Sequence, residues 1–229
     1  MKASPSIVIP ALNAAATMGR TLDGLRRERA GEVGEIIVVD GGSDDETVAI
    51  AEALGARVVP APSGRGHQLA RGAEAAAGEW LLFLHADTLP ERGWADALAA
   101  FAAEPDNAER AAVFRFALDD PSPAARRLER VVAWRTRALA LPYGDQGLFL
   151  SRAFYDALGG FRPLPLFEDV DLIRRIGRRR LEMLNVRAVT SSARYRGPGY
   201  VARSARNLGC LGLYFLGVKP ALIAKLYGR

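Results

Sequence analysis

The segment IIVVDGGSDDET, residues 36–47, decides the fold. Its first four residues are β-branched, which favours a strand buried on both faces of a parallel sheet. Asp40 follows at the carboxyl end of that strand, where open α/β sheets bind ligands, and two glycines then permit a sharp turn. Ser43 and Glu46 have the spacing of a capping box, which predicts a helix start. The Asp40 carboxylate suits a ribose hydroxyl or a base N–H, and a solvated turn ahead of a helix is the alternative.

The first 116 residues alternate strand and helix patterns. This alternation predicts βαβ units in a mostly parallel central sheet flanked by helices, an α/β fold. The expected strands are Ser6–Ile9, Glu35–Val39, Arg57–Val59, Trp80–Leu84 and Ala111–Phe116, and the expected helices are Ala14–Arg29, Asp45–Leu54, Gly66–Ala77 and Glu91–Ala103.

A break at residues 119–123, which contain two prolines, interrupts the alternation. Beyond it the pattern predicts further elements and then weakens, so we expect one domain over residues 1–190, with halves at 1–116 and 117–190, and a C-terminal helical extension over 191–229. The further elements expected are helices over Ala124–Leu139, Arg152–Leu158 and Glu168–Arg175 and a strand over Gly144–Leu150.

The composition is that of an ordinary globular protein, with 49% apolar and 25% charged residues. Cys210 is the one cysteine among 229 residues, so no internal disulfide can form, which fits a reducing compartment such as the cytoplasm. The first residues have too short an apolar run for a signal peptide, and no window approaches the roughly 18 apolar residues of a spanning helix.

Charge is distributed unevenly along the chain. Residues 174–229 contain thirteen Lys and Arg but one acid, Glu182, although the whole chain has a net charge of only +5. Such asymmetry favours an anionic partner, either a phosphate, a lipid headgroup or a nucleic acid. A solvated basic face is the alternative. We expect no nucleic-acid partner, because the segment has no recognisable reader motif.

The first strand is followed by Pro10-Ala11-Leu12-Asn13-Ala14, which has neither the glycines of a dinucleotide-binding loop nor those of a P-loop. A later strand ends in His85-Ala86-Asp87-Thr88. A carboxylate at this edge of a sheet can hold Mg²⁺ or Mn²⁺ against a diphosphate. A helix-capping Asp and a partly buried His are the alternative.

A third acidic cluster, Glu168-Asp169-Val170-Asp171, begins a predicted helix. Carboxylates are favoured there by the helix dipole alone. The functional interpretation is that one of them points into a cleft and acts as a general base.

Together these motifs resemble the family-two inverting nucleotide-sugar glycosyltransferases, which have a GT-A fold. The resemblance runs in order from residue 6 to about residue 176. It rests on SIVIPALN at 6–13, DGGSDDET at 40–47, Gly64-Arg65-Gly66, HADT at 85–88 and Glu168-Asp169. The HADT variant and the ending Gly217-Val218-Lys219-Pro220 resemble a bacterial subgroup known by its association with radical-SAM proteins.

The resemblance implies a nucleotide-binding half over residues 1–116 that takes a nucleoside diphosphate sugar. Asp40 is expected on the base or its ribose, and Asp87 on a divalent metal, Mn²⁺ or Mg²⁺, that bridges the diphosphate. His85 and Arg65 are expected beside the nucleotide. The nucleobase pocket is expected to be lined by Pro10, Leu12 and Asn13.

The resemblance also implies an acceptor half over residues 117–190. Asp169 would deprotonate the acceptor hydroxyl, and Glu168 would help to position the acceptor. Gln146 and Asp171 are expected in the sugar and acceptor cleft. The reaction implied is a metal-assisted transfer of a sugar with inversion, in a single in-line displacement.

Two departures from the family pattern affect this expectation. His85 stands where the usual Asp-x-Asp motif has its first carboxylate, which affects metal affinity or identity. The Gln-x-x-Arg-Trp motif of processive enzymes is absent, and Arg194-Tyr195-Arg196 is its nearest equivalent, so transfer of one sugar is favoured. A sugar-phosphate nucleotidyltransferase and a catalytically degenerate binding module remain as alternatives.

Residues 208–218, LGCLGLYFLGV, form an apolar stretch between basic residues. Such a segment can lie in the headgroup region of an anionic membrane and bring the active site to a lipid-linked acceptor, which would make the chain a peripheral protein at the inner face of the cell membrane. A helix packed on the sheet is the alternative.

Overall fold

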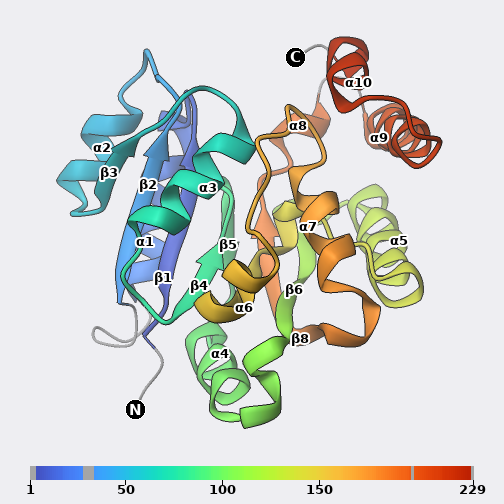
Figure 1. The fold of residues 1–229 in the computed structure, drawn as a ribbon. Helices are drawn as coiled ribbons and strands as arrows, with labels where there is room; N and C mark the ends of the chain where they lie inside the picture. Colours follow the sequence, from blue (N-terminus) through green and yellow to red (C-terminus); the bar gives the residue numbers. More distant parts are fainter. Residues whose placement is uncertain (1–3, 28–33, 197–198, 228–229) are drawn as a thin grey trace.

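An eight-stranded sheet crosses the computed structural model, which describes residues 4–27, 34–196 and 199–227 (Figure 1). Its strand order is β3-β2-β1-β4-β7-β6-β8-β5. The first four of these are mutually parallel, β6 and β8 are parallel to each other, and β7 and β5 are antiparallel to their neighbours. The strands are β1 Ser6–Ala11, β2 Glu35–Asp40, β3 Arg57–Pro60, β4 Trp80–Phe83, β5 Thr88–Pro90, β6 Ala111–Leu118, β7 Leu148–Ser151 and β8 Leu181–Thr190.

Helices cover both faces of this sheet (Figure 1). They are α1 Ala15–Arg27, α2 Thr47–Ala53, α3 Arg65–Ala75, α4 Trp94–Ala103, α5 Pro123–Leu139, α6 Arg152–Ala157, α7 Glu168–Ile176, α8 Ala193–Arg196, α9 Tyr200–Phe215 and α10 Pro220–Tyr227, with short 3₁₀ turns at Pro105–Glu109, Gly144–Gln146 and Arg178–Arg180. None of the helices in the described residues has the length and apolar character needed to cross a membrane.

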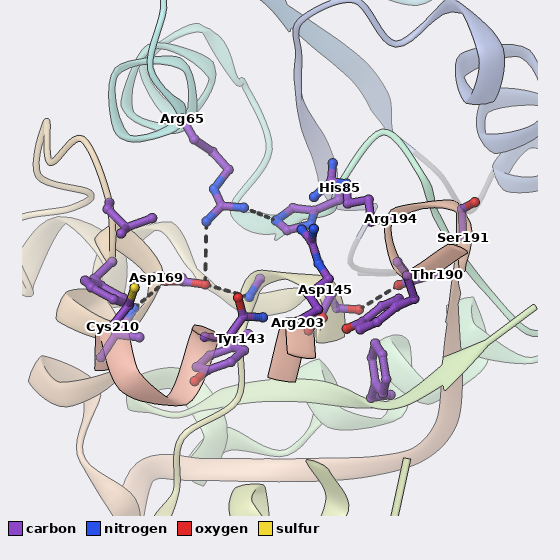
Figure 2. A pocket seen from close by; sticks show the side chains of 17 residues that line it. Arg65, His85, Tyr143, Asp145, Asp169, Thr190, Ser191, Arg194, Arg203 and Cys210 are labelled. Carbon is purple, nitrogen blue, oxygen red and sulfur yellow. Dashed lines mark hydrogen bonds and ion pairs between the residues drawn. The ribbon is translucent and has the colours of Figure 1, made fainter. Parts of the chain in front are cut away.

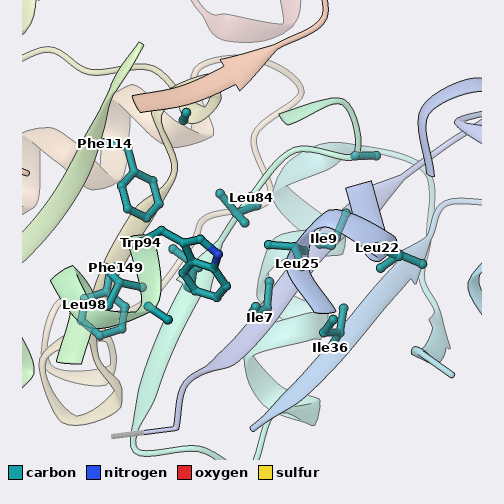
Figure 3. Packing of buried hydrophobic residues seen from close by; sticks show 14 of the residues in the cluster. Ile7, Ile9, Leu22, Leu25, Ile36, Leu84, Trp94, Leu98, Phe114 and Phe149 are labelled. Atoms are coloured by element: carbon teal, nitrogen blue, oxygen red, sulfur yellow. The ribbon is translucent and has the colours of Figure 1, made fainter. Parts of the chain in front are cut away.

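The core has two layers because successive strand residues point to opposite faces of the sheet. On one face, Ile7 and Ile36 pack against α1, α2 and α4, with Leu22 and Trp94 among the contacts (Figure 3). The alternate residues of the same strands, such as Val8 and Ile37, pack on the other face against α3, α6 and α7. The unbroken apolar runs of β1 and β2 are therefore buried on both sides, as the sequence predicts.

Helix α3 lies unusually close to the sheet. A Cβ atom on Gly72 would meet Val8 at 2.2 Å and Val39 at 2.8 Å, so only glycine fits there. One turn earlier, the buried Gln68 amide donates to the carbonyl oxygens of Ala11 at 2.6 Å and Val39 at 2.8 Å. These contacts fix the first turn of α3 over the carboxyl ends of β1 and β2.

The expected α/β fold with a mostly parallel sheet and C-terminal helices is confirmed, and three local predictions are corrected. Residues 144–146 form a 3₁₀ turn, so the predicted strand begins only at Leu148. Helix α4 begins at Trp94 because Glu91 instead pairs its N–H with Arg187 of β8. The predicted first helix is described only to Arg27, and its last two expected residues lie outside the described residues.

The sequence pattern also missed β5 and β8. β8 spans ten residues but is only partly buried, so it has no continuous apolar run that would indicate a strand. β5 has three residues and pairs only with β8.

Candidate functional site

The carboxyl ends of β1, β2 and β4 meet at one edge of the sheet, where a cleft of about 720 Å³ opens. We call this the large cleft. Six of the residues that the sequence analysis assigned to the nucleotide and the metal line it together, namely Pro10, Leu12, Asn13, Arg65, His85 and Asp87. Parallel strands bring their ends together in this way, so segments up to 77 residues apart contribute to one site.

Asp40 does not line the large cleft but organises the turn beside it. Its carboxylate accepts hydrogen bonds from the Gly42 N–H at 3.0 Å, the Ser43 N–H at 3.1 Å and the Ser43 hydroxyl at 2.6 Å. The Ser43 hydroxyl in turn accepts the Asn13 N–H at 2.9 Å. The nucleoside contact expected of Asp40 thus stays a prediction, and its observed role is to hold Asn13 at the cleft wall.

The same contacts show that the predicted capping box is wrong. Helix α2 begins at Thr47, and Glu46 precedes it with no side-chain cap hydrogen bond. Ser43 lies four residues before the start of α2, outside the N-cap position, and its hydroxyl instead bonds to Asp40 and Asn13.

Arg65, the first residue of α3, lies at the centre of the site (Figure 2). Its Nε donates to Glu168, its Nη1 to His85 Nε2 at 3.2 Å, and its Nη2 lies 3.9 Å from Asp169 Oδ2. Burial lowers the pKa of Arg65, but the two carboxylates outweigh burial and hold that pKa above its ordinary value. Because a guanidinium only donates, His85 Nε2 accepts this bond and the ring proton lies on Nδ1.

The two carboxylates at the start of α7 have different surroundings. Glu168 is fully buried, and burial raises its pKa although Arg65 opposes the rise. The Asp169 side chain is 14% exposed and accepts the N–H of Gly144 and the N–H of Val170, each at 2.8 Å. Of this pair, Asp169 is therefore the carboxylate that a bound molecule can reach.

Asp169 faces a second cavity of about 120 Å³, which we call the small pocket (Figure 2). Arg65, His85, Ser191 and Arg194 line both cavities, so the large cleft and the small pocket share a wall. The small pocket is also lined by residues from the C-terminal helices, namely Tyr195, Arg203, Asn207 and Cys210.

Asp87 lies on the large-cleft side of this wall. Its carboxylate is 3.3 Å from Arg194 Nη2 of α8 and accepts a hydrogen bond from Thr88 at 3.4 Å. The sequence analysis noted Arg194 only as the nearest equivalent of a missing motif. Arg194 is brought near Asp87 by a hydrogen bond from the Ser191 N–H to the Asp87 carbonyl oxygen, at 3.0 Å. No local sequence pattern predicts this contact.

Gln146 and Asp171 do not reach either cavity, contrary to the expectation for both. Gln146 is fully buried, accepts the Thr136 hydroxyl at 2.9 Å and donates to the Phe114 carbonyl oxygen at 3.0 Å. The Asp171 carboxylate points along α7 to Arg175, at 2.6 Å, and to Arg162, at 3.2 Å. Both residues hold neighbouring segments in place and contribute no surface to the cavities.

Asp145, beside Gln146, is a small-pocket residue that the sequence analysis did not assign. Its Oδ1 atom is buried and has no hydrogen-bond partner among the described residues. Burial raises the pKa of the Asp145 carboxyl to about 6, with the Asp169 and Asp87 carboxylates adding to the rise and Arg135 opposing it. Asp145 lies in the 3₁₀ turn at residues 144–146. Gly144 of the same turn lies so close to His85 that a Cβ would be 2.5 Å from Nε2.

A pH titration of stability can test the environment of Asp145. The folded chain binds this proton more tightly than the unfolded chain does, so the associated stability is present at low pH and is lost as the pH rises from 3.8 through about 6. Relative to Asp145→Asn, the wild type should lose up to roughly 3 kcal/mol of unfolding free energy over that interval. The exposed Asp106→Asn is the control. The unfolding free energy is measured by urea unfolding at each pH. If it depends on pH in the same way in the wild type and in Asp145→Asn, the raised pKa of Asp145 is contradicted.

No cluster of three or more His, Cys, Asp or Glu side chains that could hold a metal occurs in the described part of the chain. Asp87 is the carboxylate that lines the large cleft, and His85 Nε2 beside it is bonded to Arg65. Such a donor set fits a hard divalent cation only if a ligand supplies further oxygens, as Mg²⁺ in phosphate sites commonly requires.

A mostly parallel sheet with a cleft at its carboxyl edge, a carboxylate on the cleft wall and a second carboxylate beyond the wall fits the GT-A fold. A model of the family "Glycosyl transferase family 2" matches residues 6–156, and the chain therefore belongs to glycosyl transferase family 2. This membership disfavours the nucleotidyltransferase alternative.

Curated relatives support this assignment. A PGL/p-HBAD biosynthesis glycosyltransferase of Mycobacterium tuberculosis is 41% identical over 107 residues, which are 43% of this chain and 41% of that protein. A glucosyl-3-phosphoglycerate synthase of Mycolicibacterium smegmatis is 37% identical over 93 residues, or 37% of this chain and 31% of that protein. The matched part of the chain thus spans less than half the length of either relative.

Solved structures share the fold. Glucosyl-3-phosphoglycerate synthase from Mycobacterium tuberculosis aligns over 94% of this chain and 81% of its own length, with a TM-score of 0.64 and 24% identity. A complex of that enzyme with Mn²⁺, UDP-glucose and phosphoglyceric acid aligns over 80% of this chain and 69% of its own length, with a TM-score of 0.60 and 25% identity.

Proposed function

We propose that this glycosyltransferase transfers a single sugar from a nucleoside diphosphate sugar in the large cleft to an acceptor hydroxyl in the small pocket, with inversion. The observation that carries the proposal is the wall shared by the two cavities. Asp87 lies on one side of the wall and Asp169 on the other, with Arg65 and His85 between them. A sugar bound against this wall has its anomeric carbon open to attack from the small pocket.

UDP-glucose is the first donor to test, because a similar structure at 25% identity contains UDP-glucose with Mn²⁺. On this proposal Pro10, Leu12 and Asn13 bind the base, and Asp40 acts on the nucleoside either directly or through Asn13. Arg65 and Arg194 supply positive charge near the diphosphate, since both line the large cleft.

A divalent cation, Mn²⁺ or Mg²⁺, is part of the proposal. Asp87 would hold it together with diphosphate oxygens, and the cation would offset the charge that develops on the leaving group. Only one carboxylate serves the site because His85 replaces the other. The contact between Arg194 and Asp87 supports a role for Arg194 as a second source of positive charge at the same place.

Asp169 is the proposed general base. It takes the proton of the acceptor hydroxyl while the hydroxyl oxygen forms a bond to the anomeric carbon and the bond from that carbon to the diphosphate oxygen breaks. Because attack and departure occur on opposite faces of that carbon, the configuration inverts. The Gly144 and Val170 N–H groups fix the Asp169 carboxylate in place, and Glu168 holds Arg65 beside it.

The acceptor is defined only by the chemistry of the small pocket. Arg194 and Arg203 give one part of its wall positive charge, whereas Phe116, Leu166 and Tyr195 give another part an apolar or aromatic surface. An acceptor with a hydroxyl, an anionic group and an apolar portion suits this lining. The HADT variant at residues 85–88 supports placing the chain in the radical-SAM-associated subgroup, which names no substrate.

The metal assignment is tested by Asp87→Ala. Because Asp87 is the proposed protein ligand of the cation, UDP should raise the melting temperature of the wild type more with Mn²⁺ than without it, and this Mn²⁺-dependent part should vanish in the variant. Asp106→Ala, an exposed carboxylate outside both cavities, is the control. An unchanged Mn²⁺-dependent shift in Asp87→Ala would mean that the cation binds elsewhere.

The general base is tested by Asp169→Asn in the slow hydrolysis of UDP-glucose, where water replaces the acceptor. We expect UDP release to fall about 10²-fold or more, the usual contribution of a general base, while UDP still stabilises the protein. Asp171→Asn is a matched control on the same helix and should change the rate less than about twofold, because Asp171 lies outside both cavities.

Two outcomes would overturn these assignments. A wild-type rate in Asp169→Asn would remove Asp169 as the base. If the wild type hydrolyses neither UDP-glucose nor another nucleotide sugar, the chain is a degenerate binding module and the proposed transfer is wrong.

A further inference from the structure

Helix α9 places polar residues beside the small pocket and exposes apolar residues on its outer side. Its inward face carries Arg203, Asn207 and Cys210, which line the small pocket (Figure 2). A stripe of exposed residues at helical spacing on its outer side is apolar or glycine, namely Val201, Ala205, Leu208, Gly212 and Phe215, and Arg206 is exposed at the edge of this stripe. Surface helices normally place polar residues outward. The apolar stripe of α9 is therefore unpartnered in the described structure.

The exposed fractions are high for large apolar side chains. Val201 is 84% exposed, Leu208 66% and Leu216, just after α9, 82%. Leu222 and Leu226 on α10 are 54% and 70% exposed, and α10 packs against α9. Several large apolar side chains exposed on two helices that pack together indicate an interaction site. We name it the α9–α10 face, and it consists of Val201, Leu208, Phe215, Leu216, Leu222 and Leu226.

The helices themselves are anchored to the rest of the protein, so the α9–α10 face is held in a fixed orientation. Cys210, Leu211 and Ile223 are buried in a cluster with Phe167 and Val170 at the start of α7. The apolar stretch at residues 208–218 is thus divided between an inward part that packs on the catalytic region and an outward part that is exposed.

The charge around the α9–α10 face identifies its occupant. The chain has no Asp or Glu after Glu182, and Lys219 and Lys225 are exposed beside the apolar residues. An anionic lipid surface complements this combination of apolar and cationic groups. A second copy of the chain does not, because a symmetric contact would bring the same cations together with no acid in this segment to offset them.

We propose that the α9–α10 face docks on an anionic membrane and that docking presents the small pocket to an amphiphilic acceptor whose hydroxyl group lies at the membrane surface. The acceptor part rests on the proposed function, whereas docking does not. One helix, roughly 10 Å across, separates the docked face from the pocket lining. With 16 and 8 residues, α9 and α10 lie along the interface.

The test is co-sedimentation of the full chain with phosphatidylcholine vesicles, with and without phosphatidylglycerol, at low and high salt. We expect binding only to the anionic vesicles, weakened by salt. Leu208→Asp/Leu216→Asp and Lys219→Glu/Lys225→Glu should each weaken binding about tenfold or more. The matched controls are Ala103→Asp, exposed on α4 at the far end of the molecule (Figure 1), and Arg71→Glu, exposed on α3, and both should bind like the wild type.

The proposal would be overturned if the wild type bound neutral and anionic vesicles equally. It would also be overturned if the two control variants lost as much vesicle binding as the variants of the α9–α10 face. A dimer in sedimentation velocity that Leu208→Asp/Leu216→Asp dissociates while the wild type ignores anionic vesicles would overturn it too, because the face would then belong to a second copy. Stabilisation by UDP and Mn²⁺ is measured in every variant. If it persists while vesicle binding is absent, only the docking proposal fails. If vesicle binding persists while UDP-glucose is not hydrolysed, only the proposed reaction fails.

Discussion

The ion pair between Arg65 and the fully buried Glu168 is the interaction on which the rest of the site depends. It joins the first residue of α3 to the first residue of α7, which are 103 positions apart. A fully buried carboxylate without a partner would be costly to ionise, and removing one member of such a pair typically costs about 3–5 kcal/mol. The pair therefore holds the two halves of the sheet in one arrangement and fixes Asp169, the next residue, towards Gly144.

The supports of this pair explain why it can form. Gln68 and Gly72 seat α3 on β1 and β2, so the Arg65 guanidinium starts from a fixed point. The absence of a side chain on Gly144 lets His85 and Asp169 approach the same turn. The guanidinium can then contact Glu168, His85 and Asp169 at once, and it forms the wall between the two cavities.

The sequence predicted most strands and helices of residues 1–116 because their signals are local. Continuous apolar runs predicted β1, β2 and β4, and the topology of parallel strands then brings their carboxyl ends to one cleft. The small pocket was harder to predict. Asp145, Arg194 and Arg203 reach the small pocket through a 3₁₀ turn, a pairing with Asp87 and a helix packed on α7, and each is set by contacts distant in sequence.

The errors have similar causes. Ser43 and Glu46 have the spacing of a capping box, but tertiary partners engage the Ser43 hydroxyl, which overrides the local preference. Gln146 lies next to the residue that reaches the pocket, and a turn directs its side chain into the core instead. Residue type alone cannot distinguish a buried amide from one that faces a cleft.

The central claim is that the ion pair between Arg65 and Glu168 unites the two halves. A double-mutant cycle of unfolding free energies with Arg65→Met, Glu168→Gln and the double variant tests it most directly. Each single variant should lose about 3 kcal/mol or more, and the double variant should lose at least about 1.5 kcal/mol less than the two losses combined. Losses that add within about 0.5 kcal/mol would show that the two side chains act independently, which would contradict the account.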